Sequence, residues 1–209
     1  MTEILIVGAS GFGREVAWLI EELKEWKVVG FIDDSEEIQN TIINGIPVIG
    51  KLDFLEKVTK KTYVTIAIGN PIIRKKISER LMENKNIVFP NIIAKDIRIN
   101  RTIKLGIGNI ICTNNILTTN ISIGNFNHVN LSCTIGHDVV FNNYVTVYPG
   151  VNISGNVEIS DISEIGTGSK IIQGKHISSN VIIGAGSVIV KNIEEEGTYV
   201  GVPARRVKK

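Results

Sequence analysis

The sequence of 209 residues has few of the features that mark several large classes of protein. It contains only two cysteines, Cys112 and Cys133, and no CxxC pair, so it predicts neither a zinc site nor a disulfide scaffold. No apolar run approaches the ~20 residues that a transmembrane helix requires. The N-terminus has no basic segment ahead of an apolar one, so we expect no secretion signal and a cytoplasmic location.

Aromatic residues and net charge are scarce as well. Phe, Trp and Tyr make up 6% of the chain, and 23 Lys and Arg residues against 21 Asp and Glu leave a net charge of +2. A field this weak does not favour nucleic acid or another polyanion as a partner. Isoleucine, in contrast, supplies 38 residues and asparagine 20, which favours β-structure with an aliphatic core.

Charge is distributed unevenly along the chain. Residues 1–98 contain 28 charged side chains, residues 99–190 only 8, and residues 191–209 another 8. The length is enough for one full domain or two small ones. The distribution therefore predicts two different architectures within one chain.

The first third has the pattern of an α/β nucleotide-binding unit. An apolar run at residues 4–8 predicts a buried parallel strand, and the turn Gly8-Ala-Ser-Gly-Phe-Gly13 leads into a helical pattern over 14–23. A second strand at 28–32 ends at Asp33 and Asp34. Further strands at 63–69 and 88–89 and a helix at 71–81 would complete the unit. In such units a helix N-terminus receives phosphates and a strand-end carboxylate reaches ribose.

Simpler interpretations of the same residues stay open. The glycines follow GxxGxG rather than GxGxxG, and such a turn often serves only tight packing. Asp33 and Asp34 can form a simple solvated turn, although their position at the end of a strand slightly favours a functional role. An oxidoreductase using NAD is disfavoured, because about 90 residues supply little more than half of the usual doubly wound sheet.

The rest of the chain repeats with a period of six. Such a period predicts a solenoid in which each hexad forms one short strand and one corner, and three hexads close a triangular coil of 18 residues. Inward aliphatic residues would stack on those eighteen positions away, in about five coils, which explains the low charge of this region. The repeating positions are Ile93, Ile99, Leu105, Ile111, Leu117, Ile123, Val129, Ile135, Phe141, Val147, Ile153, Ile159, Ile165, Ile171, Ile177, Ile183 and Ile189.

The whole arrangement resembles the NeuD/PglD-type sugar acetyltransferases, which belong to the hexapeptide-repeat left-handed β-helix acyltransferases. The resemblance implies a left-handed coil, acetyl-CoA as cosubstrate, and a homotrimer with active sites between neighbouring subunits. It divides the chain into a Rossmann-like domain (1–90), a β-helix domain (91–190) and a C-terminal cap (191–209). The segments that carry it are residues 8–13, Gly30-Phe-Ile-Asp-Asp34, Ala67-Ile-Gly-Asn-Pro71, Gly136-His-Asp138 and Gly201-Val-Pro-Ala-Arg205.

His137 is the candidate general base. Acyl transfer from a thioester needs a group with a pKa near 6.5 to take the proton of the nucleophile, and a neighbouring carboxylate, here Asp138, can orient the ring. The resemblance places the base at His137, its carboxylate partner at Asp138, and a substrate-side asparagine at Asn130. His128 lies half a coil from His137, so the two histidines cannot share a metal, and no metal site is predicted.

The remaining site predictions concern the two substrates. Ser10, Gly11, Phe12, Asp33, Asp34 and Gly69 are expected to hold the nucleotide sugar. Thr167 and Ala185, one coil apart, would offer backbone groups to the pantetheine arm, and Arg205 and the tail through Lys208 and Lys209 would bind the phosphates of CoA. Two positions depart from the family pattern: Phe12 and Thr146 stand where many relatives have histidines, the latter contacting acetyl-CoA.

The sequence therefore favours an acetyl-CoA-dependent N-acetyltransferase of bacterial surface-glycan synthesis. Its acceptor would be an amino sugar linked to UDP, dTDP or GDP. An O-acetyltransferase of sialic acid or a related sugar stays open, because one histidine serves both reactions. A non-catalytic trimeric scaffold for a nucleotide-binding domain is the alternative from another class.

Overall fold

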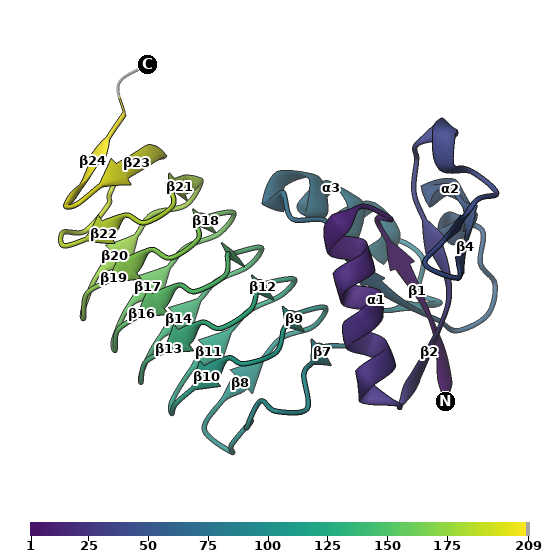
Figure 1. Ribbon diagram of the computed structural model, residues 1–209, viewed down its shortest axis with the longest axis horizontal. Coiled ribbons are helices and arrows are strands. Elements are labelled where there is room, and N and C mark those ends of the chain that lie inside the picture. Colours follow the sequence, from purple (N-terminus) through teal and green to yellow (C-terminus); the bar gives the residue numbers. More distant parts are fainter. Residues whose placement is uncertain (208–209) are drawn as a thin grey trace.

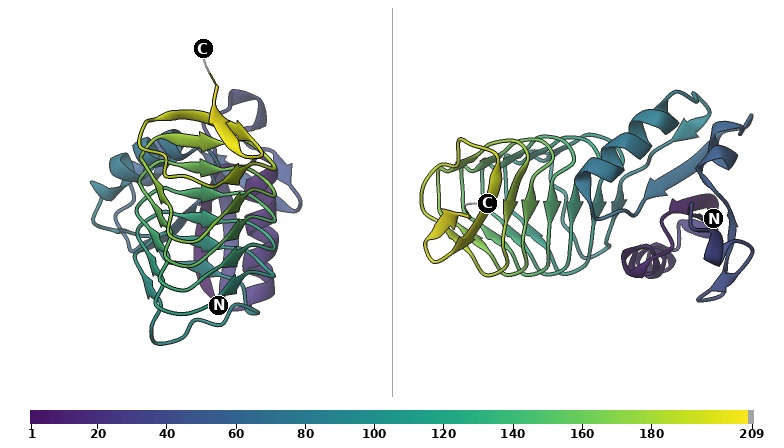
Figure 2. Two further views of the ribbon diagram at one scale, coloured as in Figure 1. Left: turned by 90° about the vertical axis from the view of Figure 1, so that its left-hand side faces the viewer. Right: turned by 90° about the horizontal axis from the view of Figure 1, so that it is seen from above.

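The computed structural model describes residues 1–207, and Lys208 and Lys209 lie outside the described part. An α/β unit built by the first third of the chain lies beside a column of short strands (Figure 1). Figure 2 shows the turns of that column stacked on one another, with the α/β unit to one side. The uneven charge distribution thus corresponds to two architectures, as the sequence predicts.

The α/β unit is built on a six-stranded sheet with the order β3-β4-β2-β1-β5-β6. The predicted strand at residues 4–8 is confirmed as the central β1, which pairs in parallel with β2 and β5. Only the edge strand β3 runs antiparallel, against β4. The strands are β1 (Thr2–Val7), β2 (Trp26–Ile32), β3 (Ile42–Ile43), β4 (Ile46–Gly50), β5 (Thr62–Ile66) and β6 (Ile87–Val88). The sequence interpretation does not include β3 and β4, and it extends β5 three residues too far.

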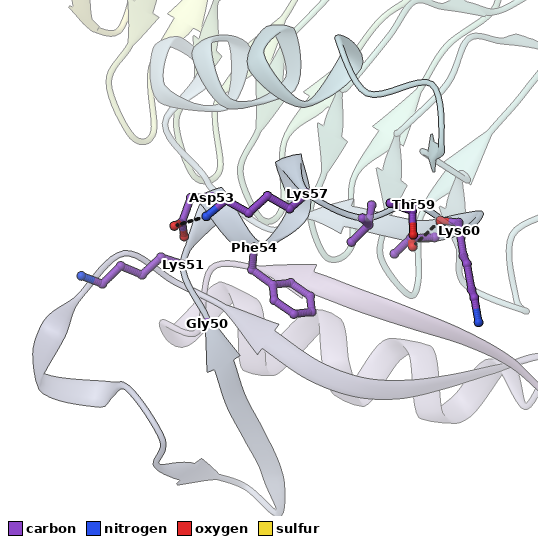
Figure 3. Close-up of a pocket in the computed structure, with 9 residues that line it drawn as sticks. Gly50, Lys51, Asp53, Phe54, Lys57, Thr59 and Lys60 are labelled. Atoms are coloured by element: carbon purple, nitrogen blue, oxygen red, sulfur yellow. Dashed lines mark hydrogen bonds and ion pairs between the residues drawn. The ribbon is translucent and has the colours of Figure 1, made fainter.

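Three helices accompany this sheet: α1 (Gly11–Leu23), α2 (Leu52–Glu56) and α3 (Pro71–Met82), with a 3₁₀ turn η1 at Glu36–Ile38. Gly13 must be glycine, because a Cβ there would lie 2.0 Å from the carbonyl oxygen of Gly8. The side chain of Asn70 caps α3 by accepting a hydrogen bond from Ile73 N at 3.0 Å. Beside α2, a cavity of about 570 Å³ opens around Phe54 (Figure 3).

The column consists of three parallel sheets whose neighbouring strands are eighteen residues apart, as in the pairing of Val129 with Val147. The sheets have the orders β10-β13-β16-β19-β22, β8-β11-β14-β17-β20 and β7-β9-β12-β15-β18-β21-β23. The strands are β7 (Ile92–Ile93), β8 (Lys104–Leu105), β9 (Ile110–Ile111), β10 (Ile116–Leu117), β11 (Ser122–Ile123), β12 (His128–Val129), β13 (Thr134–Ile135), β14 (Val140–Phe141), β15 (Thr146–Val147), β16 (Asn152–Ile153), β17 (Glu158–Ile159), β18 (Glu164–Ile165), β19 (Lys170–Ile171), β20 (His176–Ile177), β21 (Val181–Ile183) and β22 (Val188–Ile189).

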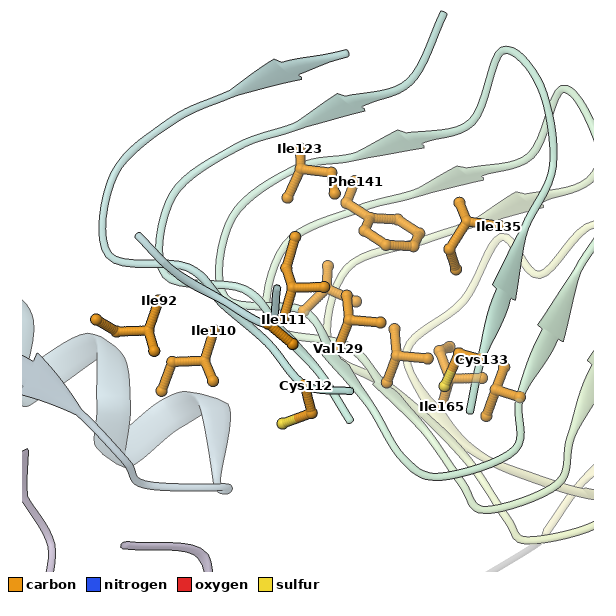
Figure 4. Packing of buried hydrophobic residues seen from close by; sticks show 14 of the residues in the cluster. Ile92, Ile110, Ile111, Cys112, Ile123, Val129, Cys133, Ile135, Phe141 and Ile165 are labelled. Carbon is orange, nitrogen blue, oxygen red and sulfur yellow. The ribbon is translucent and has the colours of Figure 1, made fainter. Parts of the chain in front are cut away.

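The repeating aliphatic residues form the core of this column (Figure 4). From Ile111 to Ile189 all of them are buried, which confirms the predicted inward stacking. The first coil is an exception: Ile99 is 40% exposed, and Ile93 and Leu105 are only partly buried. The period fails there because no strand forms between β7 and β8, so the alternation of a regular strand does not apply.

The corners of the column share one backbone conformation. Every sixth residue from Gly108 to Gly186 has a positive φ, which Asn, Asp and Gly adopt most readily. Asn114, Asn120, Asn156 and Asn180 occupy such positions. At one corner the position is instead occupied by larger residues, Phe126, Tyr144 and Ile162.

The last strands close the column. β23 (Gly197–Gly201) pairs in parallel with β21, and β24 (Ala204–Arg206) turns back antiparallel to β23. Over residues 1–207, none of the helices combines the length and the apolar character needed to cross a membrane.

Candidate active site

His137 and Asp138 form a hydrogen-bonded pair at the corner between β13 and β14. The Nδ1 atom of His137 lies 2.7 Å from Oδ2 of Asp138, and Asn120 Nδ2 donates to Oδ1 of the same carboxylate at 3.1 Å. The hydrogen bond from His137, and then that from Asn120, holds the pKa of Asp138 below its ordinary value. An ionised Asp138 accepts a hydrogen bond from Nδ1–H, which leaves Nε2 as the basic atom of the ring. The His137 side chain is 53% exposed, so this atom is within reach of a substrate.

Gly155, one coil further on, lies directly under the imidazole of His137. A Cβ at this position would be 2.5 Å from both Cε1 and Nε2 of the ring. The backbone of the next coil also holds this corner, because Asn156 N donates to the carbonyl of His137 at 2.7 Å. The sequence interpretation misses Gly155, although its position eighteen residues after His137 is a usable signal.

Asp33 and Asp34 both bind backbone amides. Asp33 Oδ2 accepts a hydrogen bond from Ala9 N at 2.9 Å, which connects the end of β2 to the glycine turn. Asp34 Oδ1 accepts from Leu52 N, the first residue of α2, at 2.9 Å. Neither carboxylate is a freely solvated turn residue, since each organises a segment around the carboxyl ends of the strands. Contact of either carboxylate with ribose stays a prediction.

The glycine turn presents open groups at the start of α1. Ser10 and Gly11 are exposed, and the Ser10 side chain makes no capping hydrogen bond although it occupies the N-cap position. Phe12 lies apart from them: its ring packs against His128 of β12, with ring centroids 5.1 Å apart. The residue that replaces a family histidine is thus part of the contact between the α/β unit and the column.

Gly69 and Thr146 meet at the same contact. The Thr146 hydroxyl donates to the carbonyl of Gly69 at 2.8 Å and accepts from Arg74 Nη2 at 2.9 Å. Thr146 is only 3% exposed, so its side chain is engaged within the chain. Its predicted contact with acetyl-CoA stays untested. Tyr148 adjoins this contact: its hydroxyl donates to Glu164 at 2.8 Å and lies 4.0 Å from the position a Cβ on Gly69 would take.

Thr167 and Ala185 stack at a second corner, the one that follows β18 and β21. Gly186 N donates to the carbonyl of Thr167 at 2.8 Å, and both predicted residues are exposed. Within residues 1–207 the amides of Thr167 and Ala185 donate to no other group of the chain. Asn130 lies on the same corner, after β12, where its side chain accepts from Leu131 N at 2.7 Å.

Arg205 is exposed in β24, and among residues 1–207 its guanidinium donates only to the carbonyl of Ala204, at 3.2 Å. Lys208 and Lys209, which complete the predicted phosphate-binding tail, lie outside the described residues. In the part of the chain that the structure describes, no three His, Cys, Asp or Glu side chains are grouped to hold a metal ion. The cavity beside α2 is lined by none of the predicted site residues.

The predicted site residues thus occupy three different edges of the column. His137 and Asp138 are at the corner between β13 and β14, and Thr167 and Ala185 at the corner after β18 and β21. The α/β unit, with Gly69, contacts the face of β12 and β15 and the corner of Phe126 and Tyr144. The structure pairs His137 with Asp138 and stacks Thr167 and Ala185, but it separates these two pairs and places Thr146 at the Gly69 contact.

Comparisons with known proteins agree with this architecture. Residues 3–81 match the family of PglD N-terminal domains. The GDP-perosamine N-acetyltransferase of Escherichia coli O157:H7 is 33% identical to this chain, in an alignment that covers 98% of this chain and 96% of that protein.

A solved structure agrees over the full length. The acetyltransferase domain of PglB from Neisseria gonorrhoeae FA1090 superposes with a TM-score of 0.93 and 31% identity, covering 99% of this chain and 100% of that one. The same domain in complex with acetyl coenzyme A gives a TM-score of 0.91 at 31% identity, over 98% of each chain. With its glycine turn, its period of six and its relatives of equal length, the chain belongs to the NeuD/PglD-type sugar acetyltransferases.

Proposed function

We propose that His137 is the general base with which this acetyltransferase acetylates the amino group of a nucleotide-linked sugar. The enzyme uses acetyl-CoA, as its family does, and the GDP-perosamine enzyme named above makes GDP-linked 4-amino sugars the first acceptors to test. The observation that carries the proposal is the pairing of His137 Nδ1 with Asp138 at 2.7 Å, in a side chain that is 53% exposed and whose Nε2 has no hydrogen-bond partner among residues 1–207. The reaction belongs to bacterial surface-glycan synthesis in the cytoplasm.

His137 Nε2 accepts a proton from the sugar amine as the nitrogen attacks the acetyl carbonyl. Asp138 keeps the Nδ1 proton in place and stabilises the imidazolium that forms. The same proton is then available to the departing sulfur, so the products are the acetamide and the CoA thiol. The amide of a corner residue near Gly136 would stabilise the oxyanion.

Acetyl-CoA supplies the acetyl group as a thioester, and the corner after β18 and β21 fits its extended arm. Thr167 and Ala185 are exposed residues whose amides have no partner among residues 1–207, so these amides can donate to the amide carbonyls of pantetheine. Arg205, with no acidic partner within 4.0 Å in the described chain, is available for a CoA phosphate.

A homotrimer with active sites between subunits is the assembly that these positions favour. The base, the cofactor amides and the Gly69 loop lie on three edges of one column, so a complete site requires edges from neighbouring copies. The coil would be left-handed, as in the family. We assign residues 1–90 to nucleotide-sugar binding, 91–190 to acetyl transfer and 191–209 to the cap.

The test is mass spectrometry of acetyl-CoA reactions with UDP-, dTDP- and GDP-linked amino sugars and CMP-sialic acid. We expect a gain of one acetyl group on an amine with the wild type, and its loss in His137→Ala with the oligomeric state unchanged. His176→Ala is the matched control, because His176 is a half-exposed coil histidine beside Glu158. Near-normal turnover by His137→Ala would refute the assignment of the base, and acetylation of sialic acid alone would favour the O-acetyltransferase.

A further inference from the structure

Arg74, in the first turn of α3, is the largest fully buried side chain of the molecule as described, with 0% exposure. Its guanidinium lies between the α/β unit and the column, and each of its nitrogens has acceptors. Nε donates to Phe126 O at 2.8 Å, Nη2 to Tyr144 O at 3.0 Å and Thr146 Oγ1 at 2.9 Å. Nη1 faces Ile68 O at 2.7 Å, Gly69 O at 2.9 Å and His128 Nδ1 at 3.2 Å.

These acceptors satisfy all five N–H groups of a guanidinium. The set is unusual because, among residues 1–207, none of the hydrogen-bond partners of Arg74 is a carboxylate. Burial lowers the pKa of Arg74 to about 9, so the side chain still carries its charge at neutral pH. A buried charge is costly, and here backbone carbonyls and one hydroxyl compensate for that cost.

The partners of Arg74 belong to two separate parts of the fold. Ile68 and Gly69 form the loop between β5 and α3, at the carboxyl end of the sheet. Phe126 and Tyr144 are corner residues of two successive coils, with φ of 53° and 60°. Thr146 donates to the Gly69 carbonyl that Arg74 also contacts, so loop, helix and coil form one closed set of hydrogen bonds.

We propose that Arg74 is a positioning residue that sets the place of the Gly69 loop, and with it the bound nucleotide sugar, relative to the column. This inference rests on the proposed function, in which Gly69 belongs to the sugar-nucleotide side of the site. Among residues 1–207, Arg74 donates no hydrogen bond to Thr167 or Ala185, the two residues expected to hold acetyl-CoA. Its loss therefore alters use of the nucleotide sugar and leaves use of acetyl-CoA unchanged.

The test compares Arg74→Lys and Thr146→Val with the wild type. Lysine keeps the charge but has three donors in place of five, so several of these carbonyls lose their partner. We expect kcat/KM for the nucleotide amino sugar to fall about 10- to 100-fold in Arg74→Lys, as for a misplaced substrate, with KM for acetyl-CoA unchanged. Thr146→Val, which removes one hydroxyl, should lower kcat/KM for the nucleotide amino sugar about 5-fold. Titration calorimetry with GDP, UDP and dTDP should show the same weakening without catalysis.

Arg80→Lys is the matched control, because Arg80 lies on the same helix but is exposed and pairs with Glu56. Thermal unfolding shows whether a variant has lost its fold or only the position of the Gly69 loop. If Arg74→Lys does not fold, the kinetics of Thr146→Val test the proposal. An unchanged kcat/KM for the nucleotide sugar in the folded variant, or a comparable rise in KM for acetyl-CoA, would overturn the role of Arg74. A wild type inactive on every amino sugar would instead refute the proposed function, and nucleotide binding would still report on Arg74.

Discussion

Replacing Gly155 by alanine tests whether the exact position of the His137 ring matters. The new methyl carbon would lie 2.5 Å from Cε1 and Nε2 of the imidazole. Ordinary contact between such atoms is about 3.5 Å, so the ring must withdraw by about 1 Å. Gly155 is not among the residues with positive φ, so its backbone accepts alanine without strain.

A displacement of about 1 Å at a catalytic group lowers the rate about 100-fold, equivalent to about 2.7 kcal/mol in the activation free energy. We therefore expect kcat to fall about 100-fold in Gly155→Ala while KM for both substrates changes little. The thermal midpoint should stay level or rise slightly, because alanine restricts the unfolded chain more than glycine does.

The assay follows CoA thiol release at saturating acetyl-CoA, in the single variants and in the double variant with His137→Ala. Without the imidazole the methyl group has room, so Gly155→Ala should add nothing to the loss caused by His137→Ala. Wild-type kcat in Gly155→Ala would refute the reasoning. A further loss in the double variant would show that Gly155 acts through something other than the ring.

Three other predictions concern the pair of His137 and Asp138, the core of the column and the two cysteines. Asp138→Asn should lower kcat about 10- to 100-fold with little change in KM, because the amide no longer enforces the Nδ1-protonated ring. Because the pKa of Asp138 is lowered in the folded chain, its contribution to stability is complete above pH 3.8 and is lost as the pH falls further. Unfolding of wild type and variant as a function of pH would show this loss. Ile159 is fully buried, so Ile159→Ala should reduce the free energy of unfolding, measured by denaturant titration, by about 2–5 kcal/mol. Ile172 is half-exposed, so Ile172→Ala should have a much smaller effect in the same titration. Both cysteines are buried and burial raises the pKa of Cys133 to about 11, so Ellman's reagent should modify neither until guanidinium unfolds the chain; rapid labelling of the native protein would contradict this burial.

The period of six is sufficient to predict most of the column, because each inward residue is specified by its own place in the hexad. Residues 111–189 follow it without exception. The same holds for the central strand β1, whose apolar run can only be buried. The hairpin of β3 and β4 gives no such signal: its strands are short, and Pro47 and Gly50 interrupt the apolar pattern.

The candidate site is recoverable from sequence only in part. The pair of His137 and Asp138 is visible because its two members are adjacent in the chain. Gly155 becomes visible only once the eighteen-residue coil is applied to His137. Arg74 is not visible, since its partners in the column lie 52 to 72 residues away in the sequence.

The composition, the repeat and the glycine turn were enough to predict a solenoid behind an α/β unit, because these are local patterns in the sequence. The family followed from the resemblance of five short segments. The distribution of the site residues over three edges of the column, and the buried guanidinium that joins loop to coil, required the folded chain. They depend on how coils and sheet pack against each other. The spacing of these residues along the sequence does not encode this packing.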